Sequence, residues 1–322
     1  MKYDAKSALL GGIIDYAGTF PPAALSLSQT LAHAMHFRKQ GKQPWLMGRL
    51  TVTLSDLKKV GNRLLYDSGA DGSAWVFTAL GTPLDSQASH EWSKTIEWDL
   101  REIQHWEEKR RESSLRQEVV GYEIKLPLFA TDAASSEFFK RLFDRWQRVA
   151  SPQITPYFEV GLQGDWQQQL KAVATGLSVG LETLDNAALI PAIKVRTGGQ
   201  WVPPADCLAE VLGTTTSYGF RFKATQGLHE AITHGNSYGF VNLFAAINLV
   251  QALGTDHFGK GAIKDCLTVE DPSAFSFGTN YFSFRNYRLD LETIEASRSR
   301  HGATFGSCSV DEPDESLAKT FP

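Results

Sequence analysis

The stretch that decides the fold covers residues 190–224. It begins with the β-rich segment Ile-Pro-Ala-Ile-Lys-Val-Arg (190–196), which ends at the turn Thr-Gly-Gly (197–199). A helical segment (204–212) follows with proline at its first position, and residues 219–224 are again rich in strand-forming side chains. A strand, a helix and another strand in this order are typical of a βαβ unit, in which both strands are parallel.

The same alternation continues in both directions along the chain. Eight β-rich segments are predicted to be strands, at residues 12–16, 46–53, 74–79, 119–126, 155–160, 190–196, 219–224 and 303–307. Helices are expected between most of them, at residues 26–39, 93–111, 137–150, 166–175 and 204–212. Eight strands with intervening helices favour a closed (β/α)₈ barrel of the α/β class over an open sheet.

One connection is longer than a crossover requires. Between the seventh and eighth predicted strands lie an apolar helix (240–253), a segment rich in Phe and Tyr (275–287) and a short amphipathic helix (291–299). We interpret residues 228–287 as an insertion beside the barrel mouth, within a single domain of residues 1–322. Its aromatic residues would pack the insertion, or line a lid or a subunit interface. An alternative places the eighth strand at 238–243, which would leave 303–307 without a role.

The composition of the chain argues against several classes of binding partner. The net charge of −4 offers no basic surface for nucleic acid or for an anionic membrane. The three cysteines are far apart and form no CxxC pair, which argues against a disulfide framework or a zinc knuckle. No apolar run approaches membrane-spanning length, and residues 1–4 lack a signal-peptide pattern. We therefore expect a cytoplasmic protein with a small-molecule substrate, and a homo-oligomer is compatible with the sequence.

Charged residues recur at every second position near the ends of three predicted strands. These pairs are Glu123 and Lys125, Lys194 and Arg196, and Arg221 and Lys223. Residues two apart on a strand share one face, and barrel enzymes gather their chemistry at the carboxyl ends of the strands. Burial without partners would cost several kcal/mol for each such group. We therefore expect these charges, with Glu159 and Arg49, to form a mutually neutralising polar cavity.

Lys194 and Lys223, on adjacent predicted strands, are the central candidates. A second cation or a desolvated setting lowers the pKa of a lysine from about 10.4 toward neutrality and supplies the free amine that attacks a carbonyl carbon. We expect Lys223 to hold the pKa of Lys194 down, and Glu123 to move protons through a water. A structural role remains open, because Lys194 could simply pair with Glu159 or Glu123.

Two segments resemble motifs of deoxyribose-phosphate aldolase, a class I aldolase. Residues 193–199 (Ile-Lys-Val-Arg-Thr-Gly-Gly) resemble the sixth-strand motif Lys-Thr-Ser-Thr-Gly of that family, whose lysine forms a Schiff base. Residues 222–229 (Phe-Lys-Ala-Thr-Gln-Gly-Leu-His) resemble its seventh-strand pattern Lys-x-x-Gly-Gly-x-Arg, which holds the second catalytic lysine. The resemblance therefore implies a Schiff base on Lys194, with Lys223 as its catalytic neighbour.

Three weaker similarities follow in the family's own order. Glu123 stands four residues before Pro127, where the family has an aspartate, and residues 14–16 (Ile-Asp-Tyr) are similar to its first-strand Ile-Asp-His. Residues 305–309 (Phe-Gly-Ser-Cys-Ser), ahead of a C-terminal helix, resemble its Gly-x-Ser-Ser phosphate loop. The pair Gln226-Gly227 replaces two glycines, and His229 replaces an arginine. These departures alter half of the family's phosphate cradle.

The resemblance implies a lyase of carbohydrate metabolism that forms a Schiff base with a small sugar-like or keto-acid-like carbonyl compound. The expected catalytic residues are Lys194, Lys223 and Glu123, with no organic cofactor and no metal. The expected substrate-binding residues are Asp15, Arg49, Lys125, Glu159, Arg196, His229, Gly306 and Ser307. Two other functions remain open. One is a cofactor-free isomerase, epimerase or decarboxylase acting on a sugar acid or phosphate, and the other is a barrel without catalysis that binds a ligand or a partner protein.

Overall fold

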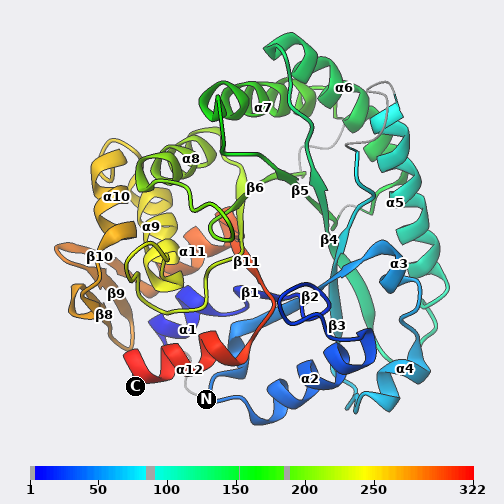
Figure 1. Ribbon diagram of the computed structural model, residues 1–322, viewed down its shortest axis with the longest axis horizontal. Helices are drawn as coiled ribbons and strands as arrows, with labels where there is room; N and C mark the ends of the chain where they lie inside the picture. The colour runs from blue at the N-terminus through cyan, green and yellow to red at the C-terminus, as the bar shows by residue number, and fades with distance from the viewer. Residues whose placement is uncertain (1–3, 85–90, 152, 185–188) are drawn as a thin grey trace. The chain divides into compact units, whose positions relative to one another are not determined.

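The computed structural model describes residues 4–84, 91–151, 153–184 and 189–322, so residues 1–3 of the N-terminal stretch discussed above lie outside the described part. Eight parallel strands form a closed barrel in the order β1-β11-β7-β6-β5-β4-β3-β2 (Figure 1). The predicted (β/α)₈ barrel is confirmed, and β6 and β7, the strands that carry the two candidate lysines, are neighbours in it.

The elements follow the predicted alternation. The barrel strands are β1 (Ile14–Tyr16), β2 (Met47–Thr53), β3 (Trp75–Leu80), β4 (Gln117–Lys125), β5 (Thr155–Glu159), β6 (Ala192–Arg196), β7 (Arg221–Thr225) and β11 (Thr304–Ser307). The longer helices are α2 (Leu27–Gln40), α5 (Trp92–Glu108), α6 (Asp132–Val149), α7 (Trp166–Leu181), α8 (Ala205–Tyr218), α9 (Phe240–Leu253), α11 (Leu291–His301) and α12 (Asp311–Thr320). The shorter helices are α1 (Ala5–Leu10), α3 (Leu54–Leu57), α4 (Asn62–Asp67) and α10 (Lys260–Thr268).

Helix α7 extends beyond the predicted end at residue 175. The added part contains Gly176 and Gly180, and glycine weakens an isolated helix. In the structure Gly180 lies directly against α6: a Cβ atom at that position would come within 2.8 Å of the Cβ atom of Phe139. Helices α6 and α7 therefore pack so closely that only glycine fits at this position of α7. The helix propensity of the local sequence does not reveal this packing.

The chain divides into two compact units, which we describe separately. One comprises residues Met1–Ser26, His33–Gly48 and Arg196–Pro322, and the other Leu27–Ala32 and Arg49–Val195. In the first, α9 is buried and its Phe240 stacks on Phe305 of β11, with ring centroids 5.9 Å apart. In the second, Phe139 of α6 meets Phe158 of β5 edge to face at 5.1 Å. That the chain is one domain with an insertion stays a prediction.

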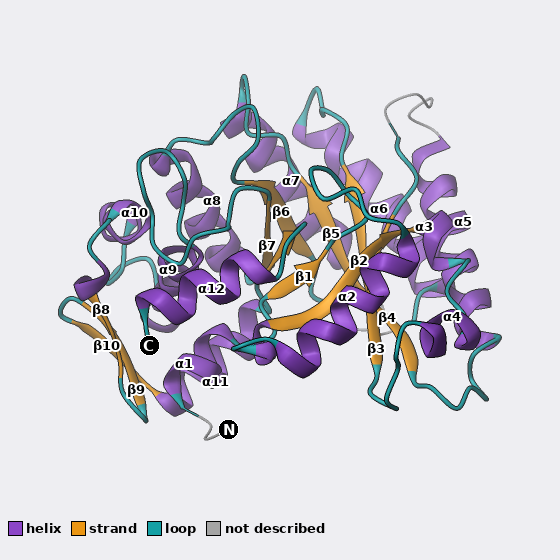
Figure 2. Cartoon of the chain, turned by 60° about the horizontal axis from the view of Figure 1, so that its bottom comes forward, coloured by secondary structure: helices purple, strands orange, loops and turns teal. Residues whose placement is uncertain are grey.

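The long connection between β7 and β11 has its own secondary structure. It contains α9, α10, a three-stranded antiparallel sheet and α11. The sheet consists of β8 (Phe275–Phe277), β9 (Tyr281–Phe284) and β10 (Tyr287–Asp290), and Figure 2 shows it beside α1 and α11. The eighth barrel strand is β11, because the alternative segment 238–243 leads into helix α9. Phe275, Phe282 and Phe284 are buried, which agrees with packing within this region.

No helix among the described residues is long and apolar enough to cross a membrane. The most apolar one, α9, has 14 residues, and its side chains from Phe240 to Val250 are buried. Helix α9 is thus a helix of the protein interior, as expected for a helix that is apolar on all sides.

A buried carboxylate fixes the loop that follows β3. Asp99 of α5 is fully buried and accepts hydrogen bonds from the backbone N–H of Thr82 (2.7 Å), from the Thr82 hydroxyl (2.8 Å) and from the Tyr122 hydroxyl (2.5 Å). Burial, with the nearby charge of Asp99, raises the pKa of Tyr122 well above its usual value, so this hydroxyl stays a donor. Asp99 therefore links α5, β4 and the loop at the carboxyl end of β3.

Replacing Asp99 by alanine is expected to lower the free energy of unfolding by about 3 kcal/mol, because donors around it lose a charged acceptor in the interior. Urea titration monitored by circular dichroism measures this. Asp144→Ala is the matched control: Asp144 is half exposed and pairs with Arg148 at 2.7 Å, so its loss should cost less than about 1 kcal/mol. Equal effects of the two substitutions would contradict the assigned role of Asp99.

Candidate functional site

Lys194 lies between two buried carboxylates. Its side-chain nitrogen is 2.6 Å from a carboxylate oxygen of Glu123 and 2.8 Å from one of Glu159. The exposed fractions of the Lys194, Glu123 and Glu159 side chains are 7%, 3% and 8%, so the ion pairs form largely out of contact with water. The expected pairing of Lys194 with Glu123 or Glu159 is thus realised with both.

The strand register explains why these side chains meet. Glu159 of β5 is the partner of Lys194 in β6 and of Lys125 in β4. Glu123 lies two residues before Lys125 and therefore shares its face of the sheet. Because side chains alternate along a strand, the intervening Ile124, Phe158 and Val195 point to the opposite face, and all three are buried. The period of two in the sequence predicted this convergence.

The expected direction of the pKa change at Lys194 is wrong. Burial does act to lower the pKa of this ammonium group, as we expected. The negative charges of Glu123 and Glu159 and their hydrogen bonds outweigh burial, so the pKa of Lys194 is raised above its ordinary value. Sequence reasoning counted the neighbouring cations and gave too little weight to two carboxylates within hydrogen-bonding distance. Lys194 is therefore a protonated lysine with two proton acceptors beside it.

This raised pKa predicts a loss of stability in alkali. A group with a higher pKa in the folded state than in the unfolded state stabilises the protein fully below the unfolded value, and loses that contribution as the pH rises through the folded value. For Lys194 the loss begins above about pH 10.4, the ordinary lysine value. We expect the difference in unfolding free energy between the wild type and Lys194→Met to shrink above this pH in urea titrations. A constant difference up to pH 12 would contradict the raised pKa.

Lys223 forms a second buried cluster, in the other unit. Its ammonium group is ion-paired with Asp15 of β1, and the exposed fractions of the two side chains are 1% and 0%. Thr304 of β11 donates a hydrogen bond to the same carboxylate at 3.1 Å. The register accounts for this grouping, because Thr304 is the partner of Lys223, and Asp15 is the partner of Gly306, two residues further along β11. Asp15 is thus the counter-ion of the second candidate lysine.

The other expected binding residues differ in their environment. Arg49 of β2 is half-buried and donates a hydrogen bond to the Tyr157 hydroxyl at 3.0 Å. Lys125 and Arg196, the last residues of β4 and β6, are exposed. Arg221, which we expected near Lys223, is the first residue of β7, and its side chain lies beside Gly302, before β11 begins. It therefore belongs to the amino end of its strand, away from the end where barrel chemistry occurs.

His229, Gly306 and Ser307 lie where β7 and β11 end. His229 forms an ion pair with Glu312 of α12, with 2.5 Å between Nδ1 and the carboxylate oxygen. Gly306 is close to Thr225, whose hydroxyl oxygen would be 3.0 Å from a Cβ atom added at this glycine. The Ser307 hydroxyl donates to the carbonyl oxygen of Ser309 at 2.6 Å. Each of these three residues thus has a contact within the protein, and their expected role in substrate binding stays a prediction.

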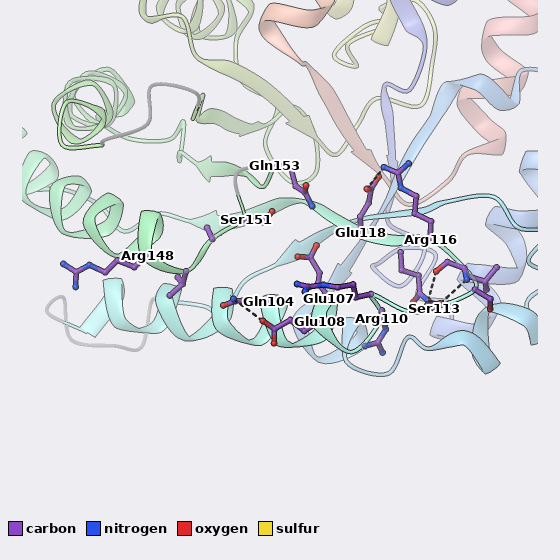
Figure 3. A pocket seen from close by; sticks show the side chains of 16 residues that line it. Gln104, Glu107, Glu108, Arg110, Ser113, Arg116, Glu118, Arg148, Ser151 and Gln153 are labelled. Atoms are coloured by element: carbon purple, nitrogen blue, oxygen red, sulfur yellow. Dashed lines mark hydrogen bonds and ion pairs between the residues drawn. The ribbon is translucent and has the colours of Figure 1, made fainter.

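A polar cavity of 750 Å³ lies in the same unit as the Lys194 cluster, near the amino end of β4 (Figure 3). It is lined by the end of α5, the start of β4 and the end of α6, and in it Arg116 pairs with Glu118 at 2.9 Å. Glu118 is near the amino end of β4, whereas Glu123 and Lys125 are near its carboxyl end. Because barrel enzymes carry out their chemistry at the carboxyl ends of the strands, we do not assign this cavity to the site.

Sequence reasoning missed Tyr157 and Thr304. Tyr157 is buried and lies two residues before Glu159, and Thr304 lies two residues before Gly306. The signal that identified the charged pairs, a polar residue at every second position, would have found both if uncharged hydroxyls had been included. Each hydroxyl forms a hydrogen bond with a residue that the sequence did identify: Tyr157 with Arg49, and Thr304 with Asp15.

Comparison of the sequence with models of protein families and with curated proteins gives no match. The class of protein is therefore stated from its fold and from the residues of its two lysine clusters. It is a (β/α)₈ barrel, an architecture that commonly carries enzymatic activity, with buried lysine–carboxylate pairs on strands β6 and β7.

Proposed function

We propose that the protein is a lyase of the class I aldolase type, which forms a Schiff base between Lys194 and a small carbonyl substrate. The observation that carries the proposal is the placement of the Lys194 ammonium group 2.6 Å from Glu123 and 2.8 Å from Glu159. Buried lysines with a proton acceptor at hand are suited to nucleophilic attack, because the acceptor releases the amine when the carbonyl arrives. The resemblance of residues 193–199 to the aldolase motif supports the same role.

The proposed reaction begins with transfer of the Lys194 proton to Glu123. The free amine then attacks the carbonyl carbon and a C–N bond forms, and the carbonyl oxygen takes up a proton from the attacking nitrogen to give a neutral carbinolamine. Proton return from the carboxylic acid lets this oxygen leave as water and produces a protonated imine. Cleavage of the C–C bond sends its electron pair into the imine to form an enamine, while a carboxylate takes the proton of the β-hydroxyl group. Protonation of the enamine and hydrolysis release the second product.

Glu159 is a second carboxylate beside Lys194 that could take the proton of the β-hydroxyl group. With Glu123 it places two carboxylates around the Lys194 nitrogen, which would stabilise the positively charged imine as they stabilise the ammonium group. Arg49 and Lys125 are the proposed contacts for polar parts of the substrate. Lys223, held by Asp15, is the proposed second catalytic lysine, an assignment supported by the resemblance of residues 222–229.

Reduction with borohydride tests the proposal. The wild-type protein is incubated with a panel of aldehydes and keto acids, reduced, digested and examined by mass spectrometry. We expect a secondary-amine adduct on Lys194 with at least one compound. Lys260, an exposed lysine paired with Glu210, serves as the internal control for non-specific reaction. Absence of an adduct on Lys194 with every compound, or labelling no greater than at Lys260, would overturn the proposal.

A second candidate function is favoured by the raised pKa of Lys194. A lysine that stays protonated can act as an acid or an anchor for negative charge, while Glu123 or Glu159 removes a proton from the substrate. This arrangement suits a cofactor-free isomerase, epimerase or decarboxylase. Substrate turnover that is unaffected by borohydride added together with the substrate would favour this function over the aldolase.

A further inference from the structure

We infer that the carbonyl substrate carries a phenyl-sized apolar group, which binds in a groove at the rim of the barrel. This inference deepens the proposed function and rests on it. The groove has a volume of 370 Å³, within the range of about 300–1,000 Å³ that is usual for small-molecule sites. It belongs to the unit that contains Lys194, Glu123 and Glu159. We call it the rim groove, and the residues that shape it are Trp92, Leu128, Phe129, Ala130, Ala134 and Phe138.

The rim groove lies at the end of the barrel strands where the Lys194 cluster lies. Its loop follows β4 directly, and the backbone N–H of Leu126 donates to the carbonyl oxygen of Glu159 at 3.0 Å. Helices α5 and α6 contribute their first turns, and helices of a (β/α)₈ barrel begin at the carboxyl ends of the strands. Leu128 follows Glu123 by five positions, so their Cα atoms are at most about 17 Å apart. A substrate with several carbon atoms between its carbonyl and its apolar group can therefore reach both places.

Aromatic rings form the walls of the rim groove. Trp92 meets Phe138 edge to face with ring centroids 5.9 Å apart, and the ring of Phe129 is 5.4 Å from that of Phe138. The first and last of these rings come from α5 and α6, which lie side by side (Figure 1). The charged residues at the edge, Glu137 and Arg141, pair with each other at 2.7 Å. The groove therefore favours an uncharged aryl or alkyl group.

The loop that carries Leu128 is held in place from α7. The side-chain amide of Gln169 donates to the carbonyl oxygen of Phe129 at 2.8 Å, and the backbone N–H of Phe129 donates to the amide oxygen of Gln169 at 2.9 Å. Leu128, the residue before, is 76% exposed. A fixed backbone thus presents an apolar side chain to solvent beside the groove. An apolar group bound there would remove part of this side chain from water, which is favourable.

The surroundings of the rim groove favour a small molecule over a protein partner. Among the large apolar side chains that are exposed in the described part of the chain, only Leu128 lines the groove, whereas Tyr66, Trp98 and Tyr218 do not. A stable protein interface buries about 800 Å² of each partner, and its core is a contiguous apolar patch. A single exposed leucine offers no such patch, but it suffices beside a groove that holds one ring.

Calorimetry with 4-phenylbutan-1-ol, which has no carbonyl group, tests the rim groove apart from the Schiff base. We expect the wild type to bind this alcohol at millimolar concentration. Ala134 is exposed and lines the groove, so Ala134→Trp should fill it and lower the affinity about tenfold or more. Leu128→Ser should weaken binding as well. Ala133→Trp is the matched control, because Ala133 is exposed on the same helix and does not line the groove. No binding by the wild type, or equal binding by the two tryptophan variants, would overturn the inference.

The borohydride assay shows whether the rim groove serves the substrate. We expect 5-phenylpentanal to label Lys194 about tenfold faster than propanal, relative to labelling of Lys260. Ala134→Trp should bring this ratio close to one, and Ala133→Trp should keep it. A ratio that Ala134→Trp leaves unchanged would overturn the inference, while adducts on Lys194 would keep the proposed function in place. Wild-type dimers that Ala134→Trp dissociates in sedimentation velocity would assign the groove to a second copy, and would also overturn the inference. Absence of every adduct, with the alcohol bound, would overturn the proposed function and leave the groove as a ligand site.

Discussion

Replacing Lys194 by arginine is expected to abolish adduct formation and to lower any lyase turnover by about a thousandfold or more. Arginine keeps a positive charge between Glu123 and Glu159, so the buried carboxylates retain a partner. Its guanidinium group does not lose a proton in the accessible pH range and cannot attack a carbonyl carbon. The substitution therefore separates the nucleophile from the ion pair. Borohydride trapping and a coupled assay for the released aldehyde measure the two effects.

Lys194→Met provides the second variant, because it removes the charge as well as the nucleophile. It should lose adduct formation like Lys194→Arg and should also be less stable, since two buried carboxylates lose their cation. Lys260→Arg on the surface is the matched control and should change neither property. If Lys194→Arg folds with the wild-type circular dichroism spectrum and retains lyase activity, Schiff-base chemistry at this residue is excluded.

The isosteric substitution Asp15→Asn is expected to lower the free energy of unfolding strongly. It removes the negative charge next to the Lys223 ammonium group, where the exposed fractions of both side chains are 1% or less. Removing one partner of a buried ion pair leaves an uncompensated charge and costs about 3–5 kcal/mol. Urea titration at pH 7 measures the change in unfolding free energy.

Asp206→Asn controls for the loss of a carboxylate as such. Asp206 pairs with Lys264 at 2.6 Å on the surface, where the exposed fractions of the side chains are 59% and 47%. An ion pair in this environment contributes about 0–1 kcal/mol. Similar small effects of Asp15→Asn and Asp206→Asn would show that Lys223 does not depend on Asp15 for its charge, and would remove the structural basis for treating the pair as one unit.

The alternation of charged residues along the strands predicted that the candidate residues Glu123, Glu159 and Lys194 would lie together. Glu123, Lys125 and Lys194 were identified because charged residues at alternate positions of a strand are costly unless they share a polar face. The same reasoning could not predict which charges would pair. It placed Arg221 beside Lys223, although the first residue of a strand and its third lie at different heights in the barrel. It also predicted a lowered pKa for Lys194. The sequence shows which charged residues are near one another in the chain, but not the distances between their side chains in the folded protein.

The alternation of β-rich and helical segments, read from residues 190–224 outward, determined the barrel, because a strand, a helix and a parallel strand can pack in few ways. Tertiary structure alone decided that Lys194 is held by two glutamates, that Asp15 is the counter-ion of Lys223, and that Glu312 of α12 pairs with His229. Electrostatic effects depend on distance and burial between residues far apart in the chain, and only the folded structure determines these quantities.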